Sequence, residues 1–494
     1  MAVAVKPVVA IVDTGAANTA SVIAALTRAG AECYLTQSPH EVARAAFVVL
    51  PGVGAFGPAA RALAASGLDR ALRERIEANL PTLCICLGLQ LLAMQSEESG
   101  AAAEQIAGLG IWPATVRRIV AAAGERVPQM GWNTLQSAIG GANPPLAAPP
   151  CVYYANSFFV SPAEVDPQRW RLYTSIYARQ AIIAAAVSAG SGQVVACQFH
   201  PELSGTFGQR LIAAWLAGAA DAVAHACSAG VPEAEQARAS TPRIVPCLDV
   251  RDGRIVKGVQ FASLRDVGDP AERASAYAAA GADEIVMLDI SAGPDGRATA
   301  AGTVAAVRQV LNIPLCVGGG VRSVADAEVL LRAGADKVAV NSAAVRNPAL
   351  IGELAQRFGR QCVVLAIDAA RTNCGPEPSW QVVIDSGRTV TERCVIEWAA
   401  EAERRGAGEI VLTSRDRDGT GLGYDAELLS AVRSRIGIPL VASGGASTPA
   451  DLAGIVGGCA DAALAASIFH DDLYTVMQVR AAMLDAQQKG AFTC

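Results

Sequence analysis

The sequence predicts an α/β domain followed by a (β/α)8 barrel. In the first part of the chain, strand-like and helix-like runs alternate as βαβα units. In the second part, eight apolar strand candidates are each followed by a helical stretch within about 250 residues, which is the length and count of such a barrel. This second part also repeats itself at a constant offset, which indicates two related half-barrels.

The first part opens on a strand candidate that reads VVAIVD, and a Gly turn then leads into a helix. Further along, the run TLCIC precedes the helix-like run LGLQLLAMQ. We expect these elements in the order strand 8–13, helix 19–28, strand 47–54, a long helix 63–79, strand 82–86 and helix 87–95.

The second part carries its repeat in a pair of glycine-rich segments. GGVRSVAD from Gly319 and GGASTPAD from Gly444 lie 125 positions apart. The same shift brings Ala335-Asp336 onto Ala460-Asp461, so each half should carry equivalent loops. The eight strand candidates begin at Ile244, Ile285, Leu315, Val338, Val363, Ile410, Leu440 and Ala462.

The stretch between the two parts is rich in Ala, Gly and small polar residues and lacks strand signals. We interpret it as the end of a helix followed by a linker. The predicted domains are therefore residues 1–218 and 242–494, with a linker at 219–241.

Composition restricts the class of protein. The net charge is −6 with no long basic run, so a nucleic acid partner is not expected. The apolar runs are too short to span a bilayer, and the first residues read as a strand rather than a signal peptide. Thirteen cysteines without a C-x-x-C pair favour free thiols in a reducing cytoplasm. We expect no membrane contact, no metal ion and no cofactor.

The stretch LCICLGLQ places a thiol where a strand turns into a helix. At such a turn the helix N-terminus lowers a thiol pKa, and backbone N–H groups can hold an oxyanion, which favours Cys86 over Cys84 as a nucleophile. A thiol also needs a base, and His200 is the best placed of the four histidines. Glu202 follows it at i+2 on one face of an extended segment, where a carboxylate would orient the imidazole.

The motifs PGVGAFG, CLGLQ and QFHPE resemble the class I glutamine amidotransferase family, whose fold is a flavodoxin-like α/β domain. DTGAANTASV and PQMGWN narrow this to a resemblance to glutaminases of the imidazole glycerol phosphate synthase family. The resemblance implies Cys86 as nucleophile, His200 as base and Glu202 as its orienter. Glutamine would give glutamate and ammonia through a thioester. The implied oxyanion and glutamine contacts are Gly52, Val53, Leu87 and Gln90.

The barrel has candidate chemistry at the ends of its strands. Asp249 ends the first strand and Asp368 the fifth, so two carboxylates face each other across the mouth, as paired acid–base work requires. Glycine pairs follow strands three and seven, and the serine-containing runs NSA and ASI follow strands four and eight. Such loops cradle phosphates. Two copies predict an elongated substrate with a phosphate at each end.

The motifs CLDVRDGRIVKGVQF, VGGGV, GADKVAVNSAAV, AIDAAR, GAGEIVLTSRDRDGTGLGYD and ASGGA resemble the TIM-barrel cyclases of the same family. The resemblance implies that ammonia adds to phosphoribulosyl-formimino-aminoimidazole carboxamide ribotide. Ring closure and cleavage would give imidazole glycerol phosphate and aminoimidazole carboxamide ribotide. Asp249 and Asp368 map to the acid–base pair. The implied substrate and phosphate contacts are Lys257, Gly320, Asn341, Ser342, Thr413, Asp418, Gly445, Ala466 and Ser467.

Ammonia must travel shielded, because the ammonium ion that dominates at neutral pH is not a nucleophile. Charged residues at the starts of strands one, two, four and six lie at the bottom of the barrel, and the resemblance implies a ring of salt bridges there at the ammonia entrance. The glutaminase would dock on that face, with the linker keeping it at high effective concentration. The four gate residues are Arg243, Glu284, Lys337 and Glu409.

Several positions depart from the family pattern and keep two alternatives open. Gln260 and Arg415 could favour a related ribotide in specialised metabolism. Cys84, Gln129 and Asn156 could favour a glutaminase half that only docks or regulates, although the Cys–His–Glu set is intact. Leu203, which follows the HPE motif, replaces a usual lysine.

Overall fold

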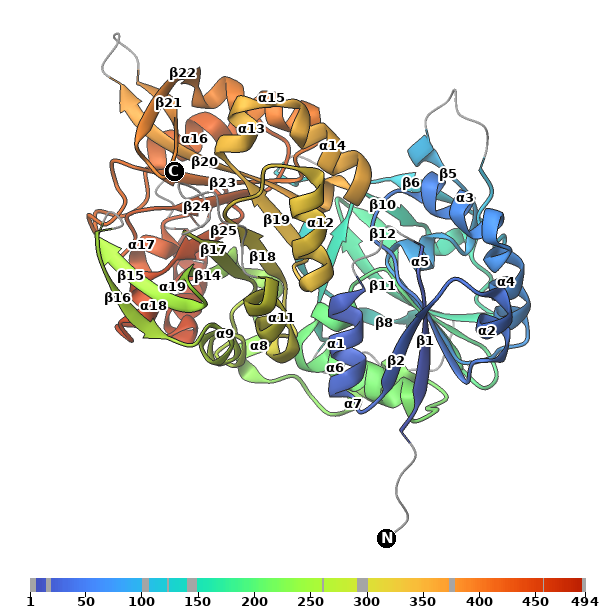
Figure 1. The fold of residues 1–494 in the computed structure, drawn as a ribbon. Helices are drawn as coiled ribbons and strands as arrows, with labels where there is room; N and C mark the ends of the chain where they lie inside the picture. Colours follow the sequence, from blue (N-terminus) through green and yellow to red (C-terminus); the bar gives the residue numbers. More distant parts are fainter. Residues whose placement is uncertain are drawn as a thin grey trace. The chain divides into compact units, whose positions relative to one another are not determined.

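The computed structural model describes residues 6–14, 19–99, 106–121, 124–139, 149–259, 262–290, 301–372, 378–455 and 457–490. Its contacts divide the chain into two compact units (Figure 1). The first comprises residues 1–123 and 128–236, and the second comprises residues 124–127 and 237–494. Two short helices, α7 (Ala222–Ser228) and α8 (Glu233–Gln236), occupy residues predicted as linker.

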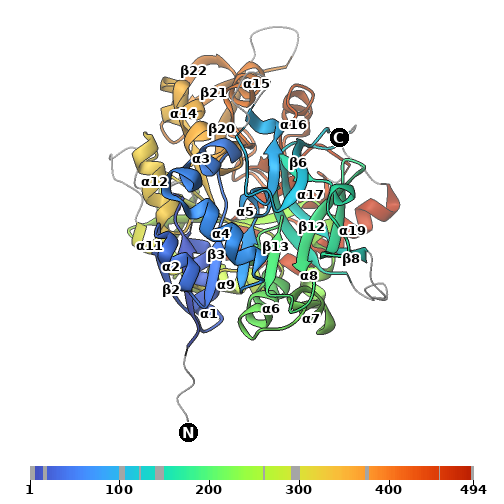
Figure 2. The same cartoon turned by 90° about the vertical axis from the view of Figure 1, so that its right-hand side faces the viewer.

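The first unit is built on a sheet of eight strands (Figure 2). Five neighbours are parallel, and three further strands extend the sheet with antiparallel pairings. The order of the parallel strands is that of a flavodoxin-like sheet, as predicted. The full order is β2 (Glu32–Thr36), β1 (Val8–Val12), β3 (Phe47–Leu50), β4 (Thr82–Ile85), β13 (Val194–Cys197), β12 (Gln180–Ser188), β11 (Trp170–Tyr177) and β8 (Gln136–Ile139).

Two smaller sheets complete the strands of this unit. One runs β10 (Phe158–Val160), β6 (Trp112–Arg118) and β5 (Ala93–Ser96), and the other pairs β7 (Gln129–Thr134) with β9 (Cys151–Asn156). The remaining helices are α1 (Ala20–Arg28), α2 (Pro39–Arg44), α3 (Phe56–Ser66), α4 (Leu68–Glu77), α5 (Leu87–Gln90) and α6 (Gly205–Leu216), with 3-10 turns η1 (Glu97–Ser99), η2 (Pro162–Glu164) and η3 (Pro201–Leu203).

Two helix predictions for this unit were wrong. The long helix at 63–79 is broken into α3 and α4 by Gly67, whose φ of 74° is left-handed and ends a helix. The helix at 87–95 lasts one turn, because the carbonyls of Leu91 and Leu92 accept hydrogen bonds from Leu109 and Trp112 instead of continuing the helix. Long-range backbone pairing therefore overrides the local helical pattern.

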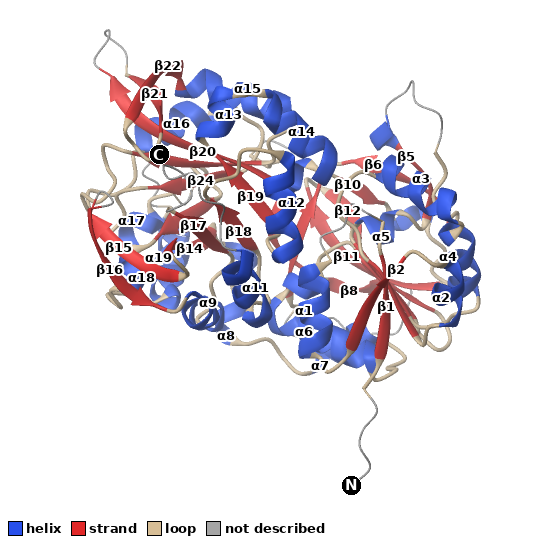
Figure 3. Cartoon of the chain, in the orientation of Figure 1, coloured by secondary structure: helices blue, strands red, loops and turns tan. Residues whose placement is uncertain are grey.

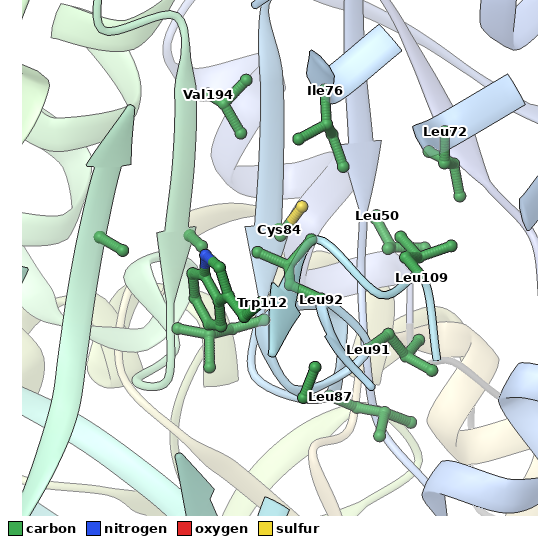
Figure 4. Packing of buried hydrophobic residues seen from close by; sticks show 14 of the residues in the cluster. Leu50, Leu72, Ile76, Cys84, Leu87, Leu91, Leu92, Leu109, Trp112 and Val194 are labelled. Atoms are coloured by element: carbon green, nitrogen blue, oxygen red, sulfur yellow. The ribbon is translucent and has the colours of Figure 1, made fainter. Parts of the chain in front are cut away.

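Cys84 packs inside the apolar core of this unit. Figure 4 shows its sulfur among apolar side chains of several elements, including Leu50, Leu92 and Val194. Its side chain is fully buried, and burial raises the pKa of its thiol to about 12. Cys84 is therefore a neutral packing residue, and it behaves as a small hydrophobe.

The second unit is a closed barrel of eight parallel strands in chain order (Figure 3). The pairing of β14 with β25 closes it, and all eight predicted strands are present. The strands are β14 (Arg243–Arg251), β17 (Ile285–Asp289), β18 (Leu315–Gly318), β19 (Lys337–Val340), β20 (Val363–Thr372), β23 (Glu409–Ser414), β24 (Leu440–Ser443) and β25 (Ala462–Ala465).

Further strands and helices surround the barrel strands. The hairpins β15 (Arg254–Val259) with β16 (Ala262–Gly268) and β21 (Ser379–Ile384) with β22 (Thr389–Cys394) extend from β14 and β20. The helices are α9 (Pro270–Ala279), α11 (Ala301–Val310), α12 (Val324–Ala333), α13 (Ser342–Arg346), α14 (Ala349–Phe358), α15 (Val395–Arg405), α16 (Ala426–Arg433), α17 (Pro449–Ala453), α18 (Ser467–His470) and α19 (Val476–Lys489), with 3-10 turns η4 (Arg238–Ser240) and η5 (Arg360–Cys362).

The predicted repeat extends to hydrogen bonds. Asp336 accepts the N–H of Leu315 at 2.9 Å, and Asp461 accepts that of Leu440 at 2.7 Å, so each carboxylate caps the start of a strand. Both residues of the second pair lie 125 positions after those of the first. Arg308 forms an ion pair with Asp336, and Arg433 forms one with Asp461. These two arginines are also 125 positions apart.

Apolar side chains from many strands pack together in the barrel interior, in a cluster that includes Val245, Cys247, Cys316 and Val441. The inside of the barrel is thus a packed core with polar groups toward its two ends. In the described part of the chain, we find no helix with the length and apolar character needed to cross a bilayer.

Candidate active sites

Three neighbouring parallel strands of the first unit carry the predicted amidotransferase residues at their carboxyl ends. Gly52 follows β3, Cys86 follows β4 and His200 follows β13. These strands lie side by side in the order β3-β4-β13. Because parallel strands end at one edge of a sheet, residues distant in the sequence converge there.

Cys86 has a strained backbone. Its φ of 51° and ψ of −104° are unfavourable for a residue with a side chain, and its N–H donates to the carbonyl of Cys197 at 2.6 Å. Such strain is typical of a nucleophile on a sharp turn between a strand and a helix. The residue is 6% exposed, so its sulfur lies in a largely dry environment.

His200 and Glu202 form a buried pair. Nδ1 of His200 lies 2.8 Å from Oε1 of Glu202, and both side chains are almost fully enclosed. An ionised carboxylate only accepts hydrogen bonds, so Nδ1 carries a proton and donates it. This tautomer leaves Nε2 to exchange a proton with Cys86.

The surroundings of His200 favour its charged form. Burial alone would lower the pKa of the imidazole, but charge interactions with Cys86 and Glu202 outweigh it, and hydrogen bonds to both add to them. The pKa of His200 therefore lies well above its ordinary value. The arrangement suits an ion pair of thiolate and imidazolium.

The predicted oxyanion segment is packed tightly against the turn after Cys86. Leu87 N–H donates to the carbonyl of Gly52 at 3.4 Å, so this predicted donor faces a backbone oxygen. A Cβ on Gly52 would lie 2.4 Å from Leu87 Cβ, and one on Gly88 would lie 2.2 Å from the carbonyl oxygen of Leu50. Only glycine fits at these two positions. Val53, the other predicted donor, is partly buried.

Gln90, predicted to seat glutamine, belongs to a buried amide network. Its Nε2 donates to the carbonyl of Phe158 at 3.0 Å and to Oε1 of Gln198 at 3.1 Å. Sequence reasoning missed Gln198. The signal was present, because Gln198 precedes His200 by two residues in the run QFHPE, and alternate residues of an extended chain share a face.

Gln129 and Asn156, which depart from the family pattern, lie opposite each other in the pairing of β7 with β9. Asn156 Nδ2 donates to the carbonyl of Phe158 at 2.9 Å, which gives this departure a structural role beside Gln90. Oε1 of Gln129 and Oδ1 of Asn156 are buried and lack a hydrogen-bond partner among the described residues. Leu203 is buried in η3.

The carboxyl ends of the barrel strands carry the second candidate site. Asp249 lies on β14 and Asp368 on β20. Burial, with a smaller contribution from Asp418, raises the pKa of Asp249 to about 7. Burial also raises the pKa of Asp368 to about 6, although a hydrogen bond from Asn341 opposes this. Two carboxyls that titrate near neutrality at one mouth suit acid–base chemistry.

Asn341, predicted for a phosphate cradle, contacts a predicted catalytic group. Its Nδ2 donates to Oδ2 of Asp368 at 3.0 Å. Thr413 pairs with Asp368 in the register of β20 and β23, and Asp418 follows β23 with its N–H bonded to the carbonyl of Ser414. The hydrogen bond between Asn341 and Asp368 joins the ends of two neighbouring strands, β19 and β20. The order of the strands in the predicted barrel was therefore the signal for it.

The two glycine-rich loops have matching backbones. Gly319 and Gly320 have φ of 99° and 70°, and Gly444 and Gly445, 125 positions later, have 88° and 101°. These left-handed values turn the chain sharply after β18 and β24. The other predicted phosphate contacts also follow strand ends, with Ser342 opening α13, Ala466 at the N-cap of α18 and Ser467 opening α18.

Three predicted or noted positions contribute less to the described geometry. Lys257 lies on β15, but its side chain is outside the described residues, as is Gln260. Arg415 is exposed, and its backbone N–H donates to the carbonyl of Ala369 at 2.9 Å. Across the described ranges, no group of histidine, cysteine and carboxylate side chains could hold a metal ion.

The four predicted gate residues form a closed ring of ion pairs at the starts of their strands. Lys337 Nζ lies 2.5 Å from carboxylate oxygens of both Glu284 and Glu409, and Arg243 pairs with the same two residues. All four side chains are at most 4% exposed. Burial would raise the pKa of Glu409, but Arg243 and Lys337 hold it lower.

Comparisons with known proteins assign each unit to a family. Residues 10–217 match the family described as glutamine amidotransferase class-I, and residues 243–475 match the family described as histidine biosynthesis protein. Imidazole glycerol phosphate synthase subunit HisF of Dehalococcoides mccartyi is 55% identical over 239 residues, which cover 48% of this chain and 93% of that protein. The chain belongs to the imidazole glycerol phosphate synthase family.

A second relative agrees with this membership. Imidazole glycerol phosphate synthase subunit HisF of Beutenbergia cavernae is 53% identical over 246 residues, covering 49% of this chain and 96% of the relative. The matched half is the barrel. The amidotransferase match lies in the same chain, so this member of the imidazole glycerol phosphate synthase family carries both parts in one polypeptide.

Proposed function

We propose that the chain is a bifunctional imidazole glycerol phosphate synthase of histidine biosynthesis. The first unit hydrolyses glutamine to glutamate and ammonia. The barrel uses the ammonia to convert phosphoribulosyl-formimino-aminoimidazole carboxamide ribotide into imidazole glycerol phosphate and aminoimidazole carboxamide ribotide. The observation that carries this proposal is the convergence of Cys86, His200 and Glu202 in a chain whose other half is a HisF-like barrel.

In the glutaminase half, Cys86 passes its proton to His200 and attacks the carboxamide carbon of glutamine. Glu202 stabilises the imidazolium that results, as its 2.8 Å contact with Nδ1 allows. His200 then returns the proton to the leaving nitrogen, so ammonia departs and a thioester remains. Water hydrolyses the thioester by the same proton transfers. The N–H of Leu87 supports the oxyanion once it exchanges the Gly52 carbonyl for the substrate oxygen.

In the barrel half, the two raised carboxyl pKa values support separate roles. Asp249, with a pKa of about 7, holds a proton for longer as pH rises and acts as the acid. Asp368, with a pKa of about 6, ionises first and acts as the base. Asn341 orients Asp368 through its amide N–H. The paired glycine loops hold the two phosphates of the substrate.

Ammonia passes from the first unit to the bottom of the barrel, where the ring of Arg243, Glu284, Lys337 and Glu409 forms the entrance. The covalent connection keeps the glutaminase at high effective concentration near its acceptor. Ten of the eleven described cysteines are free thiols, whereas Cys459 is disulfide-bonded. The ten free thiols support action in a reducing cytoplasm.

The test is product analysis with amide-15N glutamine and the bisphosphate ribotide together. We expect glutamate, imidazole glycerol phosphate and aminoimidazole carboxamide ribotide in equal amounts, with 15N in the imidazole ring. An excess of unlabelled ammonium chloride at low pH should dilute the label little if the ammonia travels inside the protein. Glutamate without an imidazole product, or an imidazole product without 15N, would overturn the proposal.

A further inference from the structure

A second buried side chain contacts the sulfur of Cys86. Gln198 directly follows β13, and its side chain is fully buried. Its Nε2 lies 3.5 Å from Cys86 Sγ, within hydrogen-bond range for a sulfur acceptor. His200 lies two residues later in the same buried segment. The nucleophile therefore has an amide donor in addition to its base.

A backbone carbonyl decides which end of the Gln198 amide faces the sulfur. Gln90 Nε2 lies 3.0 Å from the carbonyl oxygen of Phe158, which can only accept, so the Gln90 atom in this position must be its NH2 group. The same NH2 lies 3.1 Å from Gln198. Gln198 must therefore present its oxygen to Gln90 and its own NH2 to Cys86.

Two further contacts hold this chain of amides in place. Asn156 Nδ2 donates to the same Phe158 carbonyl at 2.9 Å, and the backbone N–H of Gln198 donates to the carbonyl of Ala184 at 2.8 Å. Gln90 and Gln198 are both buried, so water cannot easily replace their hydrogen bonds. The direction of the network is fixed before substrate arrives.

We propose that Gln198 donates an N–H hydrogen bond to Cys86 Sγ that stabilises the thiolate and aims it at the carboxamide carbon. This inference rests on the proposed glutaminase reaction. The proton leaves Sγ for Nε2 of His200, and the sulfur lone pair forms the C–S bond as the carbonyl π pair moves onto oxygen to give the oxyanion. The C–N bond then breaks as His200 returns the proton to the leaving nitrogen, so ammonia departs and the thioester remains. A hydrogen bond to a charged group is stronger than one to a neutral group, so the contact is strongest before attack and weakens in the neutral thioester.

The test is the pH dependence of alkylation at Cys86 by iodoacetamide, with fragment-ion mass spectrometry to separate Cys86 from Cys84. The variants are Gln198→Leu, which removes the donor at similar size, and Gln193→Leu as a matched control. Gln193 directly precedes β13, at the opposite end from Gln198, and its side chain donates to the carbonyl of Ser191. We expect Gln198→Leu to raise the pH midpoint of alkylation by about one unit, a tenfold loss of thiolate below the midpoint. The control should match the parent.

Glutamine kinetics give a second readout. Gln198→Leu should lower kcat about tenfold or more at neutral pH. Part of this loss should disappear at higher pH, where more of the thiol is ionised. A purely structural defect would not show this recovery. Gln198→Glu, which keeps the shape, covers the case in which the leucine variant fails to fold, and it should shift the midpoint in the same direction. A Gln198→Leu or Gln198→Glu profile that overlays the parent would overturn the inference. Cys86→Ala separates this outcome from failure of the proposed function, which predicts that this variant releases no glutamate.

Discussion

His200 donates a hydrogen bond from Nδ1 to Oε1 of Glu202 at 2.8 Å, across two residues of one buried segment. The carboxylate thereby selects the ring tautomer and supports the positive charge that His200 acquires when it takes the Cys86 proton. Glutamine hydrolysis should therefore depend on the charge of Glu202, and not only on its size.

Glu202→Gln keeps the size of the side chain and removes its charge. Since Glu202 helps to raise the pKa of His200, the variant should lower that pKa and weaken the thiolate–imidazolium pair. We expect kcat for glutamate release to fall about 10²-fold or more. The control is Glu97→Gln, at an exposed ion pair with Arg117, which should stay within about twofold of the parent. Parental kcat in Glu202→Gln would argue against the role of this contact.

Gly88→Ala tests the packing of the turn after Cys86. The new Cβ would lie 2.2 Å from the carbonyl oxygen of Leu50, so the backbone near Leu87 must move. Because oxyanion donors act only when well placed, we expect glutamine hydrolysis to fall more than about tenfold. Gly302→Ala is the control, because nothing lies within 4 Å of its Cβ and it lies in helix α11, where alanine is tolerated. Equal activity of the two variants would contradict the predicted crowding.

The cyclase rate, measured with ammonium salts and divided by the concentration of free ammonia, should follow a bell in pH. Below about pH 6 the base Asp368 gains a proton, and above about pH 7 the acid Asp249 loses its proton, so the rate falls on both sides. Asp249→Asn should abolish turnover at every pH even when ammonia is supplied. A flat profile from pH 5 to 9, or near-normal turnover of Asp249→Asn, would refute the acid–base roles.

Lys337→Met should destabilise the barrel by about 3–5 kcal/mol, because it leaves Glu284 and Glu409 buried beside a single cation. Lys489→Met removes an exposed pair with Asp485 and should change stability by less than about 1 kcal/mol. Differential scanning calorimetry of the full chain measures both. If the barrel unfolds at the same temperature in Lys337→Met as in Lys489→Met, the ring of ion pairs contributes little to stability.

The positions of the barrel strands could be predicted from the sequence because apolar runs bounded by turns are local signals. The eight barrel strands and their 125-residue repeat are of this kind. Helix lengths were less predictable. Gly67 breaks an apparently continuous helix by adopting a left-handed φ, and pairing of Leu91 and Leu92 with a later segment ends another after one turn.

Site residues in short motifs could also be predicted, whereas contacts between motifs could not. Cys86, His200 and Glu202 each lie in a recognisable run of residues. The Gln198 contact with Cys86 depends on β4 and β13 being neighbours, which no local pattern shows. The contact of Asn341 with Asp368 depends on β19 and β20 being neighbours, which follows from the strand order of the barrel and from neither motif alone.

The most direct test of the coupled reaction is Cys86→Ala assayed twice, once with glutamine and once with ammonium chloride as nitrogen source. The two-site account predicts no imidazole glycerol phosphate from glutamine and a near-parental rate from ammonium chloride, since only the thiol that frees ammonia is missing. Retention of glutamine-dependent synthesis in Cys86→Ala, or loss of both activities in a variant that folds normally, would contradict it.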